Sequence, residues 1–276
     1  MTIPSNDFTF LKDFLYKESG LSISEEKMYL LESRLNPIVK KMELSDLSAL
    51  IGKLRMNDAQ VKHDVIEAMT TNETFFFRDT HPFERFTDVV MPKVVESKPA
   101  GSTIRIWCAA CSSGQEPYSL GILLKEHVAK FPGYNFEIIA TDLSDDILNI
   151  AKTAKYTQFE VQRGMPITLL VKYFRQEGSD WFLNDDIKNM VRFDKFNLLD
   201  PMTKYGTIDI IFCRNVLIYF DAPTKGKVLA ELHNHCAKHG FLFLGGAETV
   251  VGITDKFKPL PGERGLYIPH DSIHTE

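Results

Sequence analysis

The sequence predicts an α/β fold preceded by an all-helical region, and three observations support this prediction. Residues 1–70 show only the helical spacing of apolar residues, whereas short apolar runs alternate with helical segments after residue 103. The stretch "ESKPAGST", residues 96–103, has the composition of a loop and separates the two patterns. The apolar runs are continuous, which indicates strands of a mostly parallel sheet that is covered on both faces.

The first 70 residues predict four helices. In "DFTFLKDFLYKESG" the apolar residues recur at helical spacing until Gly20 ends the segment. Ser22 and Glu25 have the spacing of a capping box, and a helix rich in apolar residues follows them. "LSDLSALIGKL" and "DAQVKHDVIEAM" predict the third and fourth helices.

The rest of the chain predicts alternating strands and helices. The strands are "IRIWCAA", "FEIIATD", "IDIIFCR" and "GFLFLGGAE", and the helices between them are "GQEPYSLGILLKEHVAK", "SDDILNIAKTA" and "APTKGKVLAELHNHCAKH". Turn residues "EGSD" and "NDD" interrupt residues 173–194, a range that ends within "MVRFDKF". We therefore expect a small antiparallel β-subdomain inserted at about 173–194.

Composition excludes several classes of function. A net charge of −5 disfavours a nucleic-acid binder. No apolar run reaches the roughly 20 residues of a membrane span, and "MTIPSNDFTF" lacks the pattern of a signal peptide. We expect a cytoplasmic protein with reduced cysteines. Cys108 and Cys111 form a C-x-x-C pair without nearby metal ligands, so no metal site is predicted. Small residues at a strand end are the favoured interpretation, and a redox pair is the alternative.

Polar residues follow the predicted strands, where open parallel sheets bind their ligands. Asp142 ends the second strand, and its carboxylate suits the two hydroxyls of a ribose; capping of the helix near Ser144 is an equal alternative. The loop after the first strand, "CAACSSGQEP", contains one glycine, Gly114, rather than G-x-G-x-x-G. This disfavours a dinucleotide and a dehydrogenase, and it favours a nucleoside without phosphates, for which S-adenosylmethionine is the first candidate.

The order of five motifs gives a specific resemblance. "TTNETFFFRD", "CAACSSGQEPYSLG", "ATDLS", "FNLLD" and "CRNVLIYFD" occur in this order, and together they resemble the CheR-type chemotaxis receptor methyltransferases. The resemblance covers nearly the whole chain. It implies a receptor-docking helical domain at 1–70, a linker at 71–95 that contributes to the cofactor site, and a Rossmann-like class I methyltransferase domain at 96–276 that contains the β-subdomain. It also implies methyl esters on glutamates of methyl-accepting chemoreceptors, with S-adenosylhomocysteine as product, for sensory adaptation in chemotaxis.

The resemblance also implies a set of cofactor contacts. Asp142 would hold the ribose, the "FNLLD" segment would hold the adenine edge, and the residues near 72–78 would face the methionine end. For Glu116 the alternative is a carboxylate at a helix N-terminus, and for Asn197 it is a turn residue. The implied contacts are Asn72, Thr74, Arg78, Glu116, Asp142, Asn197, Leu198, Asn215 and Val216. The neighbouring phenylalanines, 75–77, would anchor the linker between the domains, although plain core packing is the favoured interpretation.

The chemistry of a glutamate acceptor sets the expected catalytic groups. A glutamate side chain is ionised at neutral pH, since its ordinary pKa is about 4.3, so no general base is predicted. Arg78 can orient the carboxylate with two hydrogen bonds, and Tyr219 can donate one. The alternative for Arg78 is a surface salt bridge with Asp79 or Glu84, and that for Tyr219 is core packing.

Lys27, Arg34 and Lys41 are spaced seven residues apart on the second predicted helix. The resemblance implies that they meet acidic receptor helices, and a solvated basic face is the alternative; Pro37 also predicts a kink. The short turn in "RQEGSDWF" predicts no dependence on a receptor C-terminal pentapeptide, because family members that bind one have a longer glycine-rich loop. Two rival functions remain: a class I methyltransferase for another acceptor, and a cofactor-binding signalling scaffold without turnover.

Overall fold

The structure is a computed structural model that describes residues 3–274. The described chain divides into two compact units. The first contains the residues up to Thr71 together with Tyr219–Thr224, and the second contains Asn72–Ile218 and the residues from Lys225 onward. The predicted α/β fold with a helical N-terminal region and an inserted antiparallel sheet is confirmed.

The first unit contains the four predicted helices. They are α1 (Ser5–Ser19), α2 (Met28–Lys41), α3 (Leu47–Arg55) and α4 (Ala59–Met69), with a 3₁₀ turn, η1 (Glu25–Lys27), before α2. Gly20 ends α1 in the left-handed region at φ 74°, as its position in the sequence predicts. Asp46 and Asp58 accept hydrogen bonds from the first backbone N–H groups of α3 and α4.

The predicted capping box at Ser22 is wrong. The 3₁₀ turn begins at Glu25 after Ser24, whose side chain makes no capping hydrogen bond. The backbone N–H of Ser22 instead donates to the carbonyl of Tyr219 at 3.0 Å, so a contact far along the chain sets the conformation of this residue. The spacing of Ser22 and Glu25 in the sequence does not show that Ser22 has a distant partner.

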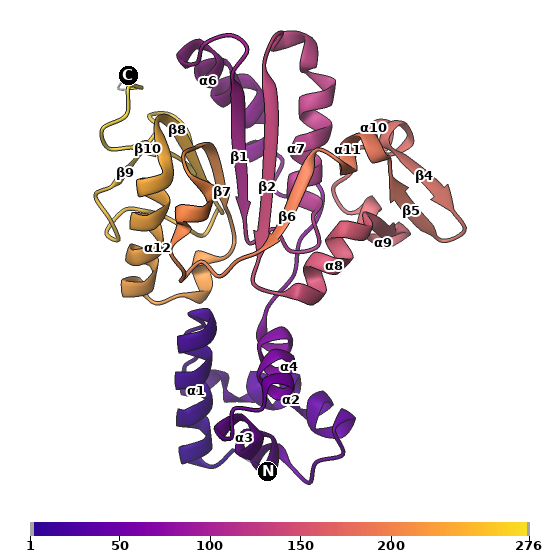
Figure 1. Ribbon diagram of the computed structural model, residues 1–276, viewed down its shortest axis with the longest axis vertical. Helices are drawn as coiled ribbons and strands as arrows, with labels where there is room; N and C mark the ends of the chain where they lie inside the picture. The colour runs from indigo at the N-terminus through magenta and orange to yellow at the C-terminus, as the bar shows by residue number, and fades with distance from the viewer. Residues whose placement is uncertain (1–2, 275–276) are drawn as a thin grey trace. The chain divides into compact units, whose positions relative to one another are not determined.

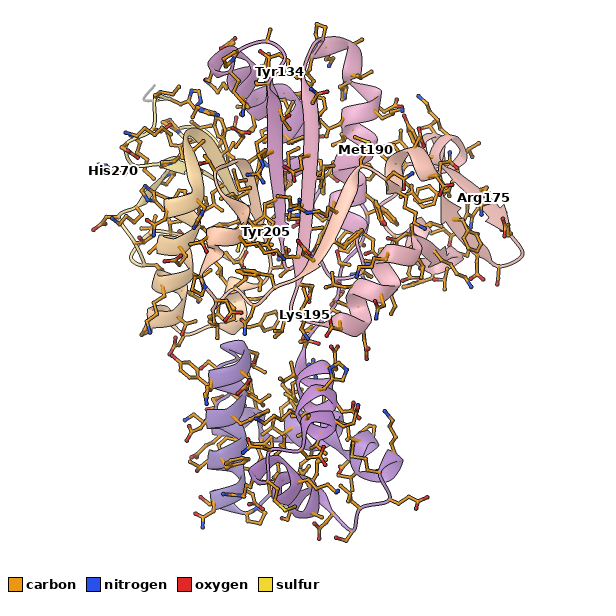
Figure 2. The ribbon with its side chains drawn as sticks, viewed as in Figure 1. Tyr134, Arg175, Met190, Lys195, Tyr205 and His270 are labelled. Atoms are coloured by element: carbon orange, nitrogen blue, oxygen red, sulfur yellow. The ribbon has the colours of Figure 1, made fainter. Side chains whose placement is uncertain are left out.

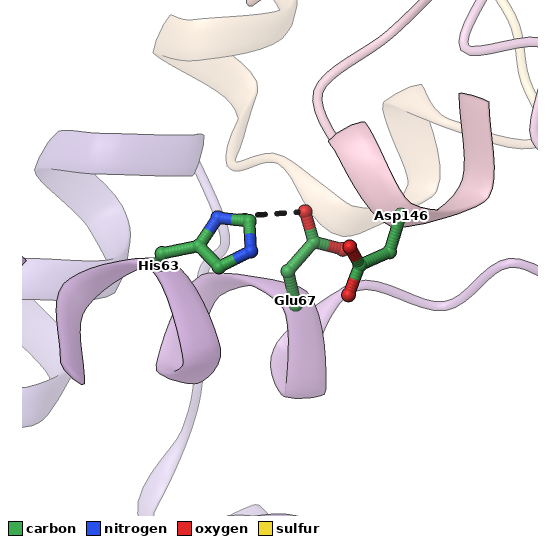
Figure 3. A group of neighbouring side chains, drawn as sticks. All are labelled: His63, Glu67 and Asp146. Atoms are coloured by element: carbon green, nitrogen blue, oxygen red, sulfur yellow. Dashed lines mark ion pairs between the residues drawn. The ribbon is translucent and has the colours of Figure 1, made fainter. Parts of the chain in front are cut away.

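Apolar residues from all four helices form the core of the first unit, among them Leu11, Leu15, Leu31, Leu35, Leu50, Leu54 and Val65. On α4, His63 and Glu67 are one helical turn apart, and their side chains form an ion pair at 3.9 Å (Figure 3). No helix within residues 3–274 is long and apolar enough to cross a membrane.

The second unit is built on a seven-stranded sheet in the order β6-β2-β1-β7-β8-β10-β9 (Figure 1). The first five of these strands run parallel, β10 pairs antiparallel with β8, and β9 pairs antiparallel with β10. Their bounds are β1 (Thr103–Ala109), β2 (Asn135–Asp142), β6 (Val191–Lys195), β7 (Ile208–Cys213), β8 (Cys236–Leu244), β9 (Phe257–Pro259) and β10 (Leu266–Pro269). The C-terminal pair, β9 and β10, has no counterpart among the strands predicted from the sequence.

Helices and short turns connect the strands. They are α5 (His81–Arg85), the π-helical turn η2 (Phe86–Val90), α6 (Met91–Ser97), α7 (Gln115–Glu126), η3 (Val128–Lys130), α8 (Asp145–Thr153), η4 (Met202–Tyr205), η5 (Leu217–Tyr219) and α12 (Ala222–His235). Helices α7 and α8 both pack against β2 and β6. Tyr134 binds the end of α6, since its hydroxyl donates to the carbonyls of Val95 and Lys98 at 2.9 and 2.8 Å (Figure 2).

The inserted sheet differs from its predicted bounds of 173–194. Its strands are β3 (Lys155–Thr157), β5 (Asp180–Leu183) and β4 (Phe174–Glu177), paired antiparallel in that order, and α9 (Gln158–Gln162), α10 (Ile167–Tyr173) and α11 (Asp185–Lys188) accompany them. The segment "MVRFDKF" does not belong to it, because β6 pairs parallel with β2 in the main sheet. The insertion therefore begins earlier than predicted, at β3, and ends before β6.

The three consecutive phenylalanines divide between core and surface. Phe76 and Phe77 lie in the core of the second unit, where the Phe76 ring contacts Tyr156 edge-on at a centroid distance of 4.9 Å. Phe75 is half-buried under the guanidinium of Arg163, which lies 4.4 Å from the ring centroid. Gly164 packs against this segment so closely that an added Cβ would lie 2.0 Å from the Phe76 carbonyl oxygen. Core packing is thus the observed role of Phe76 and Phe77.

A cluster of charged groups lies at the amino-terminal ends of β1, β7 and β8. Lys98 Nζ lies 2.8 Å from both carboxylate oxygens of Asp209, and His239 Nε2 lies 2.7 Å from Oδ1. The backbone N–H of Arg105 donates to Oδ2 at 2.7 Å. Burial raises the pKa of Asp209, but the hydrogen bonds from His239, Lys98 and Arg105 outweigh it, so the pKa is lowered.

Candidate functional site

The candidate site lies at the end of the sheet opposite this charged cluster, where the carboxyl-terminal ends of β2, β1 and β7 are neighbours. We call this end of the sheet the carboxyl edge and the end with the charged cluster the amino edge. The loops after these strands therefore converge, as they do in open α/β sheets that bind ligands. Several residues there have left-handed backbone conformations, including Ala110 at φ 63°, Ser112 at 51° and Asn215 at 60°. Such conformations are costly for residues other than glycine, and they cluster at functional sites.

Asp142 is the last residue of β2 and is only 7% exposed. Its Oδ2 accepts a hydrogen bond from the backbone N–H of Ser112 at 2.8 Å, and its Oδ1 accepts one from Ser144 N–H at 3.1 Å. The side chain that caps α8 is that of Ser144, which accepts from the Ile147 N–H. The capping alternative for Asp142 is therefore not what the structure shows, and the carboxylate links two loops at the edge of the sheet.

The loop after β1 connects the site to the segment that precedes α5. Ser112 Oγ donates to the carbonyl oxygen of Asn72 at 2.7 Å. Gly114, at φ 92°, precedes α7, and an added Cβ would lie 3.0 Å from the Tyr118 ring and 3.2 Å from the Ala151 Cβ. This single glycine is required by the turn into α7, so the loop keeps the form expected for a ligand without a pyrophosphate group.

Glu116 lies in the first turn of α7, and its side chain is 12% exposed. Burial raises its pKa, and the opposing effect of Arg214 is smaller. The Cys108 thiol forms a hydrogen bond with it. A buried carboxylate in the first turn of a helix suits an ammonium group that approaches this edge.

Arg214 lies in the "CRNV" motif but was not among the predicted site residues. Its side chain is 2% exposed; Nη1 lies 2.9 Å from Glu116 Oε2, and Nη2 lies 2.7 Å from Asp79 Oδ2. Nη2 also donates to the carbonyl oxygen of Arg78 at 3.0 Å, whereas Nε has no hydrogen-bond partner among the described residues. The signal was present in "CRNV", where an arginine directly follows a fully buried strand, a position that favours a buried or paired side chain.

The cysteines of the C-x-x-C pair are both buried and unoxidised. Burial first, and next the charge of Glu116, raises the pKa of the Cys108 thiol; burial and then Asp142 do the same for Cys111. Protonated, inaccessible thiols react poorly in disulfide exchange. This favours the interpretation of Cys108 and Cys111 as small buried residues around the site.

Arg78 and its neighbours lie on the segment before α5. Arg78 Nη1 donates to the carbonyl oxygen of Glu73 at 2.9 Å, and its guanidinium lies 5.5 Å from the centroid of the Phe75 ring. Asn72, Thr74 and Arg78 are all half-buried. The backbone carbonyls of Asn72 and Arg78 are the atoms through which Ser112 and Arg214 connect this segment to the sheet.

The segment after β6 contains Asn197 and Leu198. Asn197 Oδ1 accepts from the Leu199 N–H at 3.1 Å, and its carbonyl accepts from the Asp200 N–H at 2.9 Å. Asn197 thus makes the hydrogen bonds of a turn residue, while Leu198 is 7% exposed. The N–H of Phe196, just before them, donates to the Asp142 carbonyl at 2.9 Å, so this turn directly adjoins the end of β2.

Asn215 and Val216 follow β7, and both are half-buried. Their backbone N–H groups donate to Glu248 at 2.7 and 3.0 Å. Tyr219 ends η5 and is grouped with the first unit, where its carbonyl accepts the Ser22 N–H.

The three basic residues of the predicted docking face differ in their surroundings. Lys27 is exposed, and Lys41 lies 3.4 Å from Asp64 at the surface. Arg34 is half-buried, with Nη1 donating to the carbonyls of Met69 and Thr70 and Nη2 to the Thr71 hydroxyl. Its guanidinium therefore stabilises the C-terminal end of α4, where backbone carbonyls lack helical partners.

The groups at this edge fit an S-adenosyl ligand. Asp142 can accept hydrogen bonds from hydroxyls, and Glu116 can pair with an ammonium group. Gly114 is the single glycine of the loop after β1, so this loop lacks the G-x-G-x-x-G pattern of a pyrophosphate-binding turn. Arg214 Nε has no hydrogen-bond partner among the described residues and burial raises the pKa of Glu116, so this cluster can accept a further polar group.

Comparison with known proteins matches both units to one family. The CheR methyltransferase SAM binding domain matches residues 72–266, and the CheR methyltransferase all-alpha domain matches residues 6–70. Among relatives, the chemotaxis protein methyltransferase Cher2 of Pseudomonas putida is 37% identical over 271 residues, which cover 96% of this chain and 98% of that protein. The chemotaxis protein methyltransferase 1 of Vibrio cholerae is 37% identical over 272 residues, covering 96% and 97%.

More distant proteins share less with this chain. The chemotaxis protein methyltransferase of Borreliella burgdorferi is 33% identical over 258 residues, covering 91% of each chain. Among solved structures, PKMT2 from Rickettsia typhi is 18% identical, with a TM-score of 0.39 over 63% of this chain and 26% of that one. Membership of a family therefore rests on the sequence relatives and on the two matched domains.

Proposed function

The chain belongs to the CheR methyltransferase family, and on that premise we propose that it methylates glutamate side chains of methyl-accepting chemoreceptors to form methyl esters. The observation that carries this proposal is the match of both domains, over nearly the full length, to chemotaxis protein methyltransferases. We further propose that it acts in the cytoplasm, on the cytoplasmic helical bundle of the receptors, and serves sensory adaptation.

S-adenosylmethionine is the cofactor of the second unit, and when bound it supplies a methyl group on a positively charged sulfur. We propose that Asp142 binds the ribose hydroxyls and that Asn197 and Leu198 lie at the adenine. Glu116 would bind the ammonium group of the methionine end. Asn72, Thr74, Arg78, Asn215 and Val216 complete the proposed contacts, and the hydrogen bonds of Ser112 and Arg214 hold several of them together.

The acceptor needs no general base, because a glutamate is already ionised at neutral pH. The protein's contribution is then to hold the carboxylate in line and to exclude water, which supplies up to roughly 7–11 kcal/mol in well-oriented reactions. We propose that Arg78 orients the carboxylate through two hydrogen bonds and that Tyr219 donates a third. This assignment predicts that the rate of the transfer step changes little with pH above the pKa of glutamate.

We propose that α2 meets acidic receptor helices through Lys27 and Lys41, which are exposed. Arg34, the third residue of the predicted face, would act indirectly by holding the end of α4. The turn between β4 and β5 has only two residues, 178 and 179, which supports independence from a receptor C-terminal pentapeptide. Calorimetry with such a peptide tests this, and a micromolar dissociation constant would contradict it.

The proposed reaction is tested with radiolabelled S-adenosylmethionine and membranes rich in chemoreceptors from the same organism. We expect label that mild alkali releases as methanol and that disappears with the Asp142→Ala variant. Alkali-stable label would move the acceptor to nitrogen. Binding of the cofactor without any label, across the receptors of that organism, would favour the alternative of a signalling scaffold.

A further inference from the structure

Glu248, in the loop after β8, is surrounded by backbone N–H groups. Its Oε2 accepts from Asn215 N–H and Gly245 N–H, both at 2.7 Å. Its Oε1 accepts from Val216 N–H at 3.0 Å and from Ile218 N–H at 3.2 Å. Three of these four donors belong to the loop after β7, about thirty residues away in the sequence.

This carboxylate fixes the conformation of a loop. Asn215 has φ 60°, a left-handed conformation that asparagine adopts more readily than most residues other than glycine. Turning consecutive N–H groups of the loop toward one acceptor requires such a change of backbone direction. Hydrogen bonds to an ionised acceptor are stronger than those between neutral groups, so Glu248 can hold the loop in this conformation.

Gly245 lies directly against the contact between Glu248 and Asn215. An added Cβ on Gly245 would lie 2.7 Å from both Asn215 Nδ2 and Glu248 Oε2, and 2.9 Å from Asn215 N. The next residue, Gly246, would have no neighbour within 4 Å of an added Cβ. Only the first of these adjacent glycines is therefore part of the contact between the two loops.

We propose that Glu248 is a positioning residue for the cofactor, an inference that rests on the proposal that Asn215 and Val216 contact it. Because Glu248 occupies the N–H groups of both residues, any hydrogen bond they make to the cofactor uses a carbonyl oxygen or the Asn215 side chain. The backbone of these two residues thus presents carbonyl acceptors to the donor groups of the ligand, which are its ammonium, amino and hydroxyl groups, whereas the Asn215 amide can donate as well as accept.

The Glu248→Gln variant tests this inference. The amide keeps the size of the side chain but has one acceptor oxygen, so N–H groups of the loop face an NH₂ group instead. We expect the dissociation constant for S-adenosylhomocysteine and the KM for S-adenosylmethionine both to rise roughly tenfold, with a smaller change in kcat. A long-range effect of the lost charge would instead weaken cationic S-adenosylmethionine much more than S-adenosylhomocysteine, and that result overturns the proposal.

Three further variants keep the test decisive. Gly245→Ala retains the charge but displaces the same contacts, so it should weaken S-adenosylhomocysteine binding in calorimetry as Glu248→Gln does, even where the latter fails to fold. Gly246→Ala and Glu263→Gln are matched controls that should bind as the wild-type protein does, since an added Cβ on Gly246 meets nothing within 4 Å and Glu263 pairs with Arg85. Wild-type affinity in folded Glu248→Gln, or in folded Gly245→Ala, overturns the proposal.

One more comparison separates this inference from the site assignment. If Asn215→Ala weakens S-adenosylhomocysteine binding while Glu248→Gln does not, the loop binds the cofactor and Glu248 does not position it. If neither variant weakens binding while Asp142→Ala does, the assignment of Asn215 itself is wrong, and the inference falls with it.

Discussion

Two buried carboxylates at opposite edges of the same sheet behave differently. Asp209, at the amino edge, has a side chain that is 4% exposed and a lowered pKa, because Lys98, His239 and Arg105 N–H outweigh the effect of burial. Glu116, at the carboxyl edge, is 12% exposed and has a raised pKa, because burial outweighs the effect of Arg214. Burial is the largest effect on both pKa values, and the two groups differ in how far their partners in the chain offset it.

The difference lies in how fully each carboxylate is satisfied by the chain itself. Asp209 accepts hydrogen bonds at both oxygens from three elements of the sheet and its connections. The Glu116 cluster includes the orphaned Nε of Arg214 and lies beside several left-handed residues. A completed cluster stabilises the fold, whereas an incompletely balanced, strained one is suited to a charged ligand.

The largest expected effect is that of Asp142→Ala on the cofactor. Removing hydrogen bonds from two ribose hydroxyls to a carboxylate should weaken S-adenosylhomocysteine binding about 100-fold, or roughly 3 kcal/mol. Isothermal titration calorimetry measures it, with Asp186→Ala as control because Asp186 forms a surface ion pair with Lys125 on α7. An affinity within threefold of the wild-type value would remove Asp142 from the site.

The amino-edge cluster should instead determine stability. Asp209→Asn leaves Lys98 without its anion, which should lower the free energy of unfolding by about 3 kcal/mol at pH 7. Because the folded-state pKa of Asp209 is lowered, its contribution is complete above the ordinary pKa and disappears as the pH falls through the folded-state value. Urea unfolding measures the loss of stability, and calorimetry should show unchanged cofactor affinity. Unchanged stability together with weakened cofactor binding would invalidate the comparison.

Glu116→Gln should have the opposite character. The neutral amide lacks the attraction for an ammonium group, so we expect affinity for S-adenosylhomocysteine to fall roughly tenfold. The free energy of unfolding should change by less than about 1 kcal/mol, because relief of the buried charge offsets the weaker contact with Arg214. Calorimetry and urea unfolding on the same sample decide this, and a large loss of stability with intact binding would contradict it.

The smallest expected effect is a pH dependence of binding. The pKa of Glu116 is raised from its ordinary value of 4.5. Lowering the pH from 7 toward this raised pKa therefore protonates part of the Glu116 population and weakens binding of the ammonium group, by no more than the roughly tenfold expected for Glu116→Gln. Asp209 stays ionised in this range, since its pKa is lowered from 3.8. The dependence should be absent in Glu116→Gln; if it persists there, another group is responsible.

The sequence predicted well what depends on local pattern. The four N-terminal helices, the parallel strands and the place of the loops followed from apolar periodicity, and five ordered motifs indicated the family. The predictions failed where partners are distant. The segment of β6 was assigned to the inserted sheet because its own residues do not indicate that it pairs with β2. Ser22 was assigned to a capping box for the same reason.

Two residues of the site show the same limitation. The sequence does not show which groups Arg214 and Glu248 contact, because their partners lie up to 136 and 33 residues away. Their roles depend on which loops the sheet brings together, and only the strand order supplies that information. All of the proposed ligand contacts, those of Asp142 and Glu116 included, stay predictions.

The comparison of the two edges is tested most directly by amide hydrogen exchange with and without saturating S-adenosylhomocysteine. We predict slower exchange in peptides that cover residues 72–80, 110–116 and 213–218, and no change around Lys98, Asp209 and His239. Protection at the amino edge, or none in the three carboxyl-edge peptides although calorimetry shows binding, would contradict the account.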